Sequence, residues 1–354
     1  MRRVRGLDAL RGVAAMMVLI YHYTDNFAVP QSQRTALALP FVHLGAMGVE
    51  LFFIISGFVI YMTIERTATI RGFAISRFAR LYPTFVACLG VTLAASVLVE
   101  DYGAEAWHIS LYRSMLIANL TTAPTLFNRS AVDPSYWSLG YELAFYTLAA
   151  TATYLGGWRS PERLALGWLA ITAALRLSGV ADRWPRLELL TAANFAYLFV
   201  IGVMLFRHWA GQATQLTYWV LGIALATSLF GSSRLAEGLP EWSYPVLIVS
   251  YSLLVWVATC RSVGIFHRGI LPFLGDISYP LYLVHQVAGY VVIQFLLRRG
   301  TPLGITVITT GCIAVVVAWC ISVTIERPAR RFLRAWLDPE PERPRNARLS
   351  DGGA

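Results

Sequence analysis

The chain has 354 residues, of which 56% are hydrophobic and only 14% are charged. This composition is too apolar for a soluble domain and predicts a chain built from repeated membrane spans. All 29 basic residues are Arg, which excludes lysine Schiff-base chemistry, and they are scattered between apolar runs. The net charge of +9 therefore reflects membrane topology and predicts no nucleic-acid partner.

Apolar runs of spanning length predict an all-α fold, a polytopic transmembrane bundle of about ten helices. The runs cover residues 8–27, 46–64, 81–99, 137–156, 163–178, 190–206, 215–232, 243–260, 273–297 and 302–325. With both termini in the cytoplasm, 20 arginines lie inside and nine outside, as the positive-inside rule requires. Residues 101–136 leave one alternative open, because an extra crossing there would invert part of this topology.

The membrane domain is predicted to cover residues 1–336, and the Pro-rich, charged residues 337–354 are predicted to be a disordered cytoplasmic tail. The four cysteines have no CxxC or Cys/His spacing, so we expect no metal site. HExxH, Walker-type and GxSxG motifs are missing from the sequence, which leaves hydrolase, metalloprotease and NTPase functions without local support.

The first predicted helix carries Arg11 and His22, eleven residues apart. Eleven steps of about 100° amount to about three turns, so both side chains lie on one face, separated by roughly 16 Å along the axis. Ionisable residues inside a membrane indicate a functional site by default. Arg11 alone would equally be explained by snorkelling to the interface.

The second predicted helix enters from the outside with Glu50 near its start, at the depth of His22. A carboxylate beside an imidazole fixes its tautomer and raises its basicity, as a general base that deprotonates an alcohol requires. Glu50 by itself would also fit an ordinary interfacial charge.

The loop between the second and third predicted helices carries Arg77 and Arg80 on an expected interfacial helix before Pro83. Two guanidinium groups one turn apart can bind the phosphates of a donor such as coenzyme A. The alternative is that both are topology anchors at the lipid headgroups.

A further polar segment begins with a turn at Asp133 and continues into a helix with Trp137, Tyr141 and Glu142, at about the depth of Glu50. Aromatic residues beside carboxylates suit a sugar-like acceptor, although Trp137 and Tyr141 also fit an aromatic belt at the membrane interface.

Late in the chain, His285 is predicted to lie mid-helix after a break at Pro280. Its two alternatives are a structural hydrogen bond within the bundle and a contact with substrate. The last span is predicted to end at Glu326 and Arg327, which fit a topology anchor or a cytoplasmic gate.

Six segments in this order make the chain resemble the acyltransferase family 3 integral-membrane acyltransferases. They are RGLDALRGVAAMMVLIYH, GVELFFIISGFVI, SRFARLYP, YWSLGYELAFY, GDISYPLYLVHQ and TIERPARRF. Members of this family carry O-acyl groups onto exported polysaccharides, lipopolysaccharide sugars, Nod-factor-like oligosaccharides and macrolide antibiotics. The resemblance spans nearly the whole chain and implies a multi-pass protein of the bacterial inner membrane.

The resemblance also implies acetyl-CoA or another acyl-CoA as co-substrate from the cytoplasm, a carbohydrate or macrolide acceptor, and polysaccharide-assembly proteins as further partners. Arg11 and His22 match the family's essential pair, and Arg77 and Arg80 match its cytoplasmic arginine motif. Glu50 stands where many members have Asp or Glu. Some relatives carry an SGNH-type esterase-like domain, which we do not expect here, so acceptor handling falls to the membrane domain or a partner.

We therefore expect Arg77, Arg80 and Arg11 to hold or steer the donor while His22, oriented by Glu50, activates the acceptor hydroxyl. The roughly 16 Å between Arg11 and His22 compares with an extended pantetheine arm. Direct transfer and a transient acyl-His22 intermediate both remain open.

Of the other candidates, Glu142 is expected to act in catalysis, and the expected substrate contacts are Trp137, Tyr141 and His285. The alternative function is a proton-coupled transporter or exporter of a small solute, with the intramembrane charges as a relay, but the halves show no convincing repeat. A non-catalytic polysaccharide-assembly scaffold is disfavoured by the intact pair of Arg11 and His22.

Overall fold

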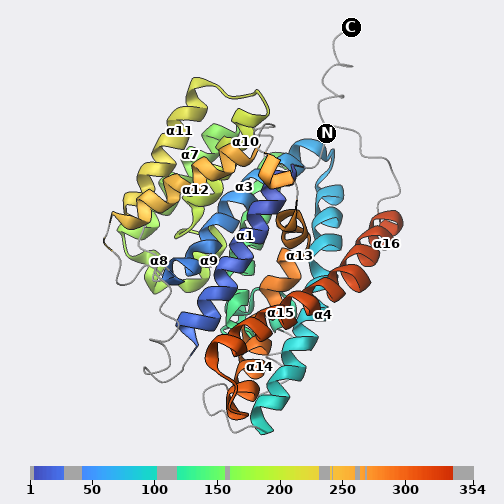
Figure 1. Cartoon of the computed structure of the whole chain (residues 1–354). Helices are drawn as coiled ribbons and strands as arrows, with labels where there is room; N and C mark the ends of the chain where they lie inside the picture. The colour runs from blue at the N-terminus through green and yellow to red at the C-terminus, as the bar shows by residue number, and fades with distance from the viewer. Residues whose placement is uncertain are drawn as a thin grey trace. The chain divides into compact units, whose positions relative to one another are not determined.

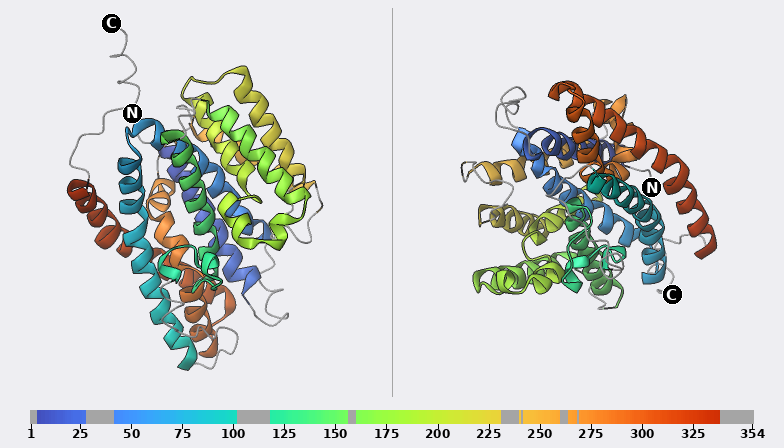
Figure 2. Two further views of the ribbon diagram at one scale, coloured as in Figure 1. Left: turned by 180° about the vertical axis from the view of Figure 1, so that it is seen from behind. Right: turned by 90° about the horizontal axis from the view of Figure 1, so that it is seen from below.

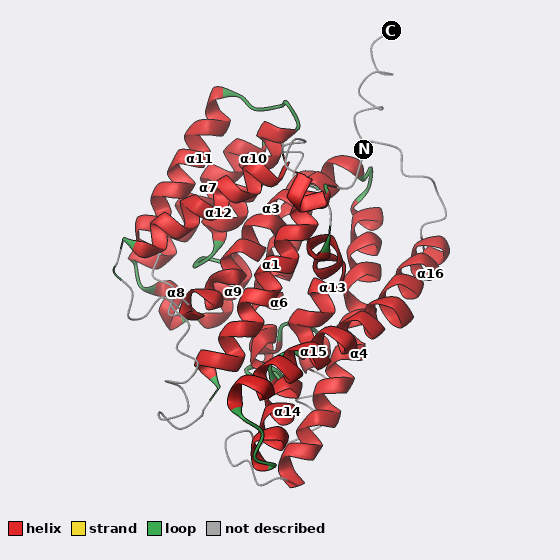
Figure 3. Cartoon of the chain, viewed as in Figure 1, coloured by secondary structure: helices red, strands yellow, loops and turns green. Residues whose placement is uncertain are grey.

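The computed structural model describes residues 4–27, 42–101, 118–155, 160–230, 240, 242–259, 264–267 and 269–337. All regular secondary structure in these ranges is helical, and none of them contains a strand (Figure 3). The predicted all-α fold is confirmed. Four helical segments of the described chain are long and apolar enough to cross a membrane, or five if the bent pair near the C-terminus counts as one span.

Every predicted span contains a helix in the structure. The α-helices are α1 (Arg5–Tyr21), α3 (Gly48–Arg66), α4 (Ile70–Asp101), α6 (Trp137–Tyr154), α7 (Pro161–Leu177), α8 (Val180–Arg183), α9 (Pro185–Thr191), α10 (Ala196–Trp209), α11 (Gln215–Thr227), α12 (Ser243–Thr259), α13 (Ile270–Val284), α14 (Val287–Arg298), α15 (Leu303–Ile321) and α16 (Arg327–Leu337). Two π-helical stretches, η1 (His22–Asn26) and η10 (Ser322–Glu326), follow α1 and α15 directly.

The separate interfacial helix predicted for Arg77 and Arg80 is wrong, because α4 runs without interruption from Ile70 through Pro83. Proline removes one backbone hydrogen bond but does not have to end a membrane helix, since neighbouring groups can satisfy the freed carbonyl.

Of the ambiguous segment 101–136, residues 102–117 lie outside the described residues. Its second half forms short turns and 3₁₀ segments, among them η5 (Pro124–Phe127) and η6 (Pro134–Tyr136).

The last span also continues beyond its predicted end. Helical structure passes from α15 through η10 into α16, so that Glu326 and Arg327 lie within a helical segment of 35 residues. The Arg327 guanidinium forms an ion pair of 3.8 Å with Asp276, and both side chains are partly exposed. Leu337 ends α16 and is the last residue that the structure describes. The rest of the tail predicted for residues 337–354 lies outside the described residues.

The chain divides into two compact units. Unit 1 comprises Met1–Val49, Leu81–Ser138 and Ile265–Ala329, and unit 2 comprises Glu50–Arg80, Leu139–Gly264 and Arg330–Ala354. The predicted single membrane domain over residues 1–336 stays a prediction.

Within unit 1, α1 packs along α13 (Figure 1). The two backbones approach so closely that a Cβ atom on Gly12 would lie 2.6 Å from the Gly275 nitrogen. A Cβ on Gly48 would similarly lie 2.6 Å from the Ala14 carbonyl oxygen. Small residues permit this close approach of membrane helices, where van der Waals packing drives association. They therefore set the position of the helix that carries Arg11 and His22.

Within unit 2, α7, α10 and α11 lie side by side (Figure 2). The Phe145 ring stacks on Phe199 with 4.4 Å between ring centroids and on Trp168 with 5.8 Å.

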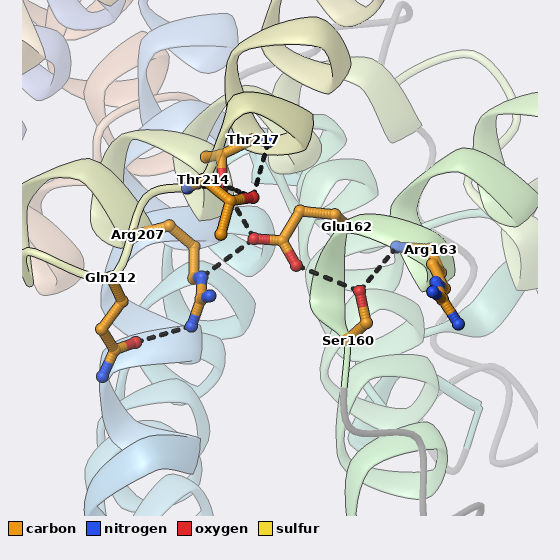
Figure 4. A network of polar contacts seen from close by, with 7 residues as sticks. All are labelled: Ser160, Glu162, Arg163, Arg207, Gln212, Thr214 and Thr217. Atoms are coloured by element: carbon orange, nitrogen blue, oxygen red, sulfur yellow. Dashed lines mark hydrogen bonds and ion pairs between the residues drawn. The ribbon is translucent and has the colours of Figure 1, made fainter.

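At one end of these helices, Glu162 accepts hydrogen bonds from Arg207 at 3.1 Å and from Thr217 at 2.8 Å (Figure 4). Glu162 precedes the predicted span 163–178. Burial acts to raise the pKa of this carboxyl, but its hydrogen bonds and the Arg207 charge outweigh burial and lower it.

Candidate functional site

His22 lies at the junction between α1 and the π-helical stretch η1. Because α1 is continuous through Tyr21 and His22 keeps right-handed helical dihedrals, Arg11 and His22 retain the same face, about 16 Å apart along the axis. His22 Nδ1 lies 2.8 Å from the Val18 carbonyl oxygen. A carbonyl only accepts, so Nδ1 carries the hydrogen, and in the neutral ring Nε2 keeps its lone pair.

The His285 ring packs against His22 inside unit 1. The ring centroids are 4.9 Å apart at 73°, and His285 Nε2 lies 3.3 Å from His22 Nδ1. His285 Nδ1 lies 2.7 Å from the Tyr282 carbonyl oxygen and therefore carries its own hydrogen. His285 Nε2 is then an acceptor for the Nδ1–H of His22. No local pattern indicated this contact, because the two residues stand 263 positions apart.

The helix break predicted at Pro280 is wrong, because Pro280 lies inside α13 and the chain bends by 76° between α13 and α14, at His285 and Gln286. Side chains bind the backbone groups that a broken helix leaves free. The Tyr23 hydroxyl donates to the His285 carbonyl at 2.7 Å, and the Asp133 carboxylate accepts the Val287 N–H at 3.1 Å. A broken helix at membrane depth requires such internal partners.

Asp133 has a larger role than the turn residue that its sequence position indicates. It is fully buried and also accepts hydrogen bonds from the Ser135 N–H at 2.9 Å and the Ser135 hydroxyl at 2.6 Å. Asp133 stands before α6, outside the spanning helices. Burial raises the pKa of its carboxyl to about 6, against the opposing effect of its hydrogen bonds.

Unit 2 contains a second polar cluster around Glu142. The Glu142 carboxylate accepts a hydrogen bond from Ser56 at 2.6 Å and another from the Tyr146 hydroxyl. Ser56 follows Glu50 by six residues, which is about 9 Å along α3. Glu142, which binds Ser56, therefore contacts α3 deeper in the predicted membrane than Glu50, although the sequence predicted the same depth for both. The charges of Arg77 and Arg80 act on the Tyr146 hydroxyl. The Tyr146 hydroxyl, which donates to Glu142, is therefore within electrostatic range of the arginine pair, although the predicted topology had placed Glu142 and the arginines at opposite sides of the membrane.

Arg77 is buried despite its charge, and its Nη2 lies 3.4 Å from the Ser76 hydroxyl oxygen, whereas Arg80 is partly exposed.

The Tyr141 hydroxyl donates to the buried Glu188, which also accepts the Asn194 N–H at 3.3 Å. Trp137, the first residue of α6, is partly buried.

Glu50 is fully buried in unit 2 and acts electrostatically on the hydroxyls of Tyr197, Tyr244 and Tyr251. Its pairing with His22, which belongs to unit 1, stays a prediction. Within the described ranges, no group of three or more His, Cys, Asp or Glu side chains is arranged to hold a metal ion.

The fold and the site define a class of protein: a multi-pass helical membrane protein in which the buried His285 contacts the partly buried His22 at a helix break. The chain belongs to acyltransferase family 3: the family model, described as an acyltransferase domain, matches residues 4–327, nearly the whole chain. The protein is accordingly a membrane acyltransferase.

Curated relatives cover most of the chain at low identity. The exopolysaccharide production protein ExoZ of Rhizobium meliloti is 28% identical over 82% of this chain and 92% of its own length. Acyltransferase MdmB of Streptomyces mycarofaciens is 26% identical over 94% of this chain and 92% of its own length. The O-acetyl transferase of Shigella phage Sf6 is 26% identical over 84% and 88% of the two chains. No solved structure matches the chain.

Proposed function

We propose that this protein transfers an acyl group, typically acetyl, from acyl-CoA to a hydroxyl of a carbohydrate or macrolide acceptor. The observation that carries the proposal is the hydrogen bonding of His22. Because Nδ1 donates to the Val18 carbonyl, Nε2 is the basic nitrogen that can accept the proton of an alcohol.

The reaction balances as a direct transfer. The acceptor hydroxyl gives its proton to His22 Nε2 while its oxygen forms a bond to the thioester carbonyl carbon. The carbon–sulfur bond then breaks, and the proton passes from His22 to the thiolate, which leaves an ester and free coenzyme A. An acyl-His22 intermediate is the alternative route, and it differs in that Nε2 attacks the thioester itself.

For the donor, we propose that Arg77 and Arg80 bind the phosphates of coenzyme A, with Arg11 as a further guanidinium for the donor. Arg77 is buried, and a guanidinium shielded from water binds phosphate more strongly than an exposed one. Glu142 is proposed to hold the arginines in place as a carboxylate partner, because the charges of both arginines act on the Tyr146 hydroxyl that donates to it.

For the acceptor, the relatives named for exopolysaccharide production and O-acetyl transfer favour a cell-surface or exported polysaccharide. Trp137 is the proposed aromatic contact for a sugar ring. Bacterial relatives and several spans support a proposed site of action in the bacterial inner membrane, with both termini cytoplasmic and polysaccharide-assembly proteins as partners.

The experiment is transfer of label from radiolabelled acetyl-CoA in membranes that contain the protein, with a panel of glycan and macrolide acceptors. Wild type is compared with His22→Ala, Arg11→Ala and the matched control His208→Ala, since His208 is an exposed histidine. We expect transfer to fall by about 10²- to 10⁴-fold in His22→Ala and to persist in the control. Transfer that survives His22→Ala contradicts the catalytic assignment, and solute flux without acyl transfer to any acceptor supports a transporter instead.

A further inference from the structure

We propose that His285 is a positioning residue, which holds His22 in the tautomer that leaves Nε2 free to act as the base. This inference rests on the proposed function of His22. It assigns to His285, within unit 1, the orienting role that the sequence predicted for Glu50, and it replaces the expected contact between His285 and substrate.

If both imidazole rings are neutral, only one placement of their ring hydrogens fits the hydrogen bonds around them. Each Nδ1 faces a carbonyl oxygen, Val18 for His22 and Tyr282 for His285, so each Nδ1 must donate. His285 Nε2, 3.3 Å from His22 Nδ1, then accepts the same hydrogen that Val18 accepts. If His22 changed to the other tautomer, a lone pair on Nδ1 would face both the Val18 carbonyl and the lone pair of His285, and two hydrogen bonds would be lost.

Burial excludes a second task for the His285 ring. Only 1% of the residue is exposed, and both ring nitrogens already have partners. A substrate hydroxyl would therefore have to break an existing hydrogen bond to reach it. The contact with His22, in contrast, is already present in the structure and requires no rearrangement.

The helix break holds His285 in place through its backbone. Tyr23, the residue after His22, donates its hydroxyl to the His285 carbonyl at 2.7 Å. The Tyr23 ring also lies where a Cβ atom on Gly289 would be, so only glycine at that position lets the hydroxyl reach the carbonyl. Two adjacent residues of η1, His22 and Tyr23, thus contact His285, one through the ring and one through the backbone.

The arrangement also favours the protonated form that His22 takes during catalysis. Once Nε2 has accepted a proton, the Nδ1–H becomes a charged donor, and its bonds to Val18 and His285 strengthen. His285 does not pass the proton on, because its own Nδ1–H faces a carbonyl that cannot accept one. His285 thus stabilises the base without acting as a proton relay.

The kinetic test compares His285→Phe, which removes the acceptor nitrogen but keeps an aromatic ring, with His285→Gln, whose amide oxygen can accept the His22 hydrogen. We expect His285→Phe to lower kcat by about 10- to 100-fold with an unchanged KM for the acceptor. His285→Gln should recover most of that loss. Wild-type kcat in His285→Phe, an equal loss in both variants, or a raised acceptor KM with unchanged kcat would overturn the proposal.

A second measurement does not depend on activity. Nitrogen-15 NMR of histidine-labelled protein in bilayers reports which ring nitrogen carries hydrogen, with the His22 signals assigned by their loss in His22→Ala. We expect His22 protonated at Nδ1 in wild type and a mixture of tautomers in His285→Phe. Protonation of wild-type His22 at Nε2 would overturn the proposal. If instead wild type shows the expected tautomer but His22→Ala retains full transfer, the proposed function fails while the positioning of His22 by His285 stands.

Discussion

The carboxylate of Asp133 accepts the backbone N–H of Val287, 154 positions later, at 3.1 Å. Val287 begins α14, directly after the bend that presents His285 to His22. A buried acid from one loop thus supplies the hydrogen-bond acceptor that the first turn of a broken helix requires. The geometry of the histidine pair therefore depends on a residue that acts through the backbone of the bend.

Removal of this acceptor should destabilise the protein. Asp133→Ala takes the acceptor away from the Val287 N–H and the Ser135 hydroxyl in a buried site, and each such group costs about 1–3 kcal/mol. We expect a lower thermal unfolding midpoint in detergent, whereas the matched control Asp182→Ala, at an exposed position, should unfold as wild type does. Equal midpoints for the two variants would contradict a stabilising role for Asp133.

The same residue should make stability depend on pH. Burial raises the pKa of Asp133 from 3.8 to about 6 on folding, so the folded state favours the protonated acid. The stabilising contribution is then complete below the unfolded pKa and is lost as pH rises to about 6. Relative to Asp133→Asn, wild type should lose about 3 kcal/mol of unfolding free energy between about pH 3 and about pH 7 and change little above that.

Chemical unfolding of both proteins in detergent across this pH range measures the difference. Because the amide introduced by Asp133→Asn does not titrate, every other pH effect is common to both proteins and cancels. A difference that stays constant with pH would show that Asp133 does not change its protonation on folding.

The contact between α1 and α13 should tolerate no side chain at Gly12. A Cβ atom there would lie 2.6 Å from the Gly275 nitrogen, so Gly12→Ala must displace one backbone. Overpacking of this kind costs about 1–3 kcal/mol, and it moves the helix that carries Arg11 and His22. We expect Gly12→Ala to lower both the unfolding midpoint and transfer activity.

The control for this change is Gly90→Ala in α4, where an added Cβ meets no atom within 4 Å. Replacing a helical glycine with alanine in open space should leave stability unchanged or raise it by up to about 1 kcal/mol. If both variants behave alike, the close approach at Gly12 does not limit packing.

Binding of the donor should depend on the arginine pair in α4. Arg77→Ala and Arg80→Ala should each raise the KM for acetyl-CoA by roughly tenfold, which corresponds to about 1.4 kcal/mol for a lost phosphate contact. Arg71, which is exposed on the same helix, provides the control variant Arg71→Ala. Initial rates at varied acetyl-CoA measure the effect, and a KM that is unchanged in the two variants would remove these residues from the donor site.

The sequence predicted the helices well because membrane spans are local features. An apolar run of spanning length forms a helix wherever it lies, and each of the ten predicted runs contains one. Local rules were less reliable for where helices break. Pro83 and Pro280 looked like breaks, yet both lie inside helices, whereas the bend falls at His285 and Gln286. Whether a helix breaks depends on which side chains are near enough to bind the freed backbone groups.

In the candidate site, too, some features follow from local sequence and others from the tertiary structure. The shared face of Arg11 and His22 follows from helical geometry over eleven residues, so the sequence by itself determined it, together with membership of the acyltransferase family. Only the tertiary structure decided the partner of His22, because His285 is 263 residues away and reaches it through a bent helix. A repeating pattern along one helix records which residues share a face, but contacts between distant helices depend on packing and on buried hydrogen bonds, which no local pattern contains.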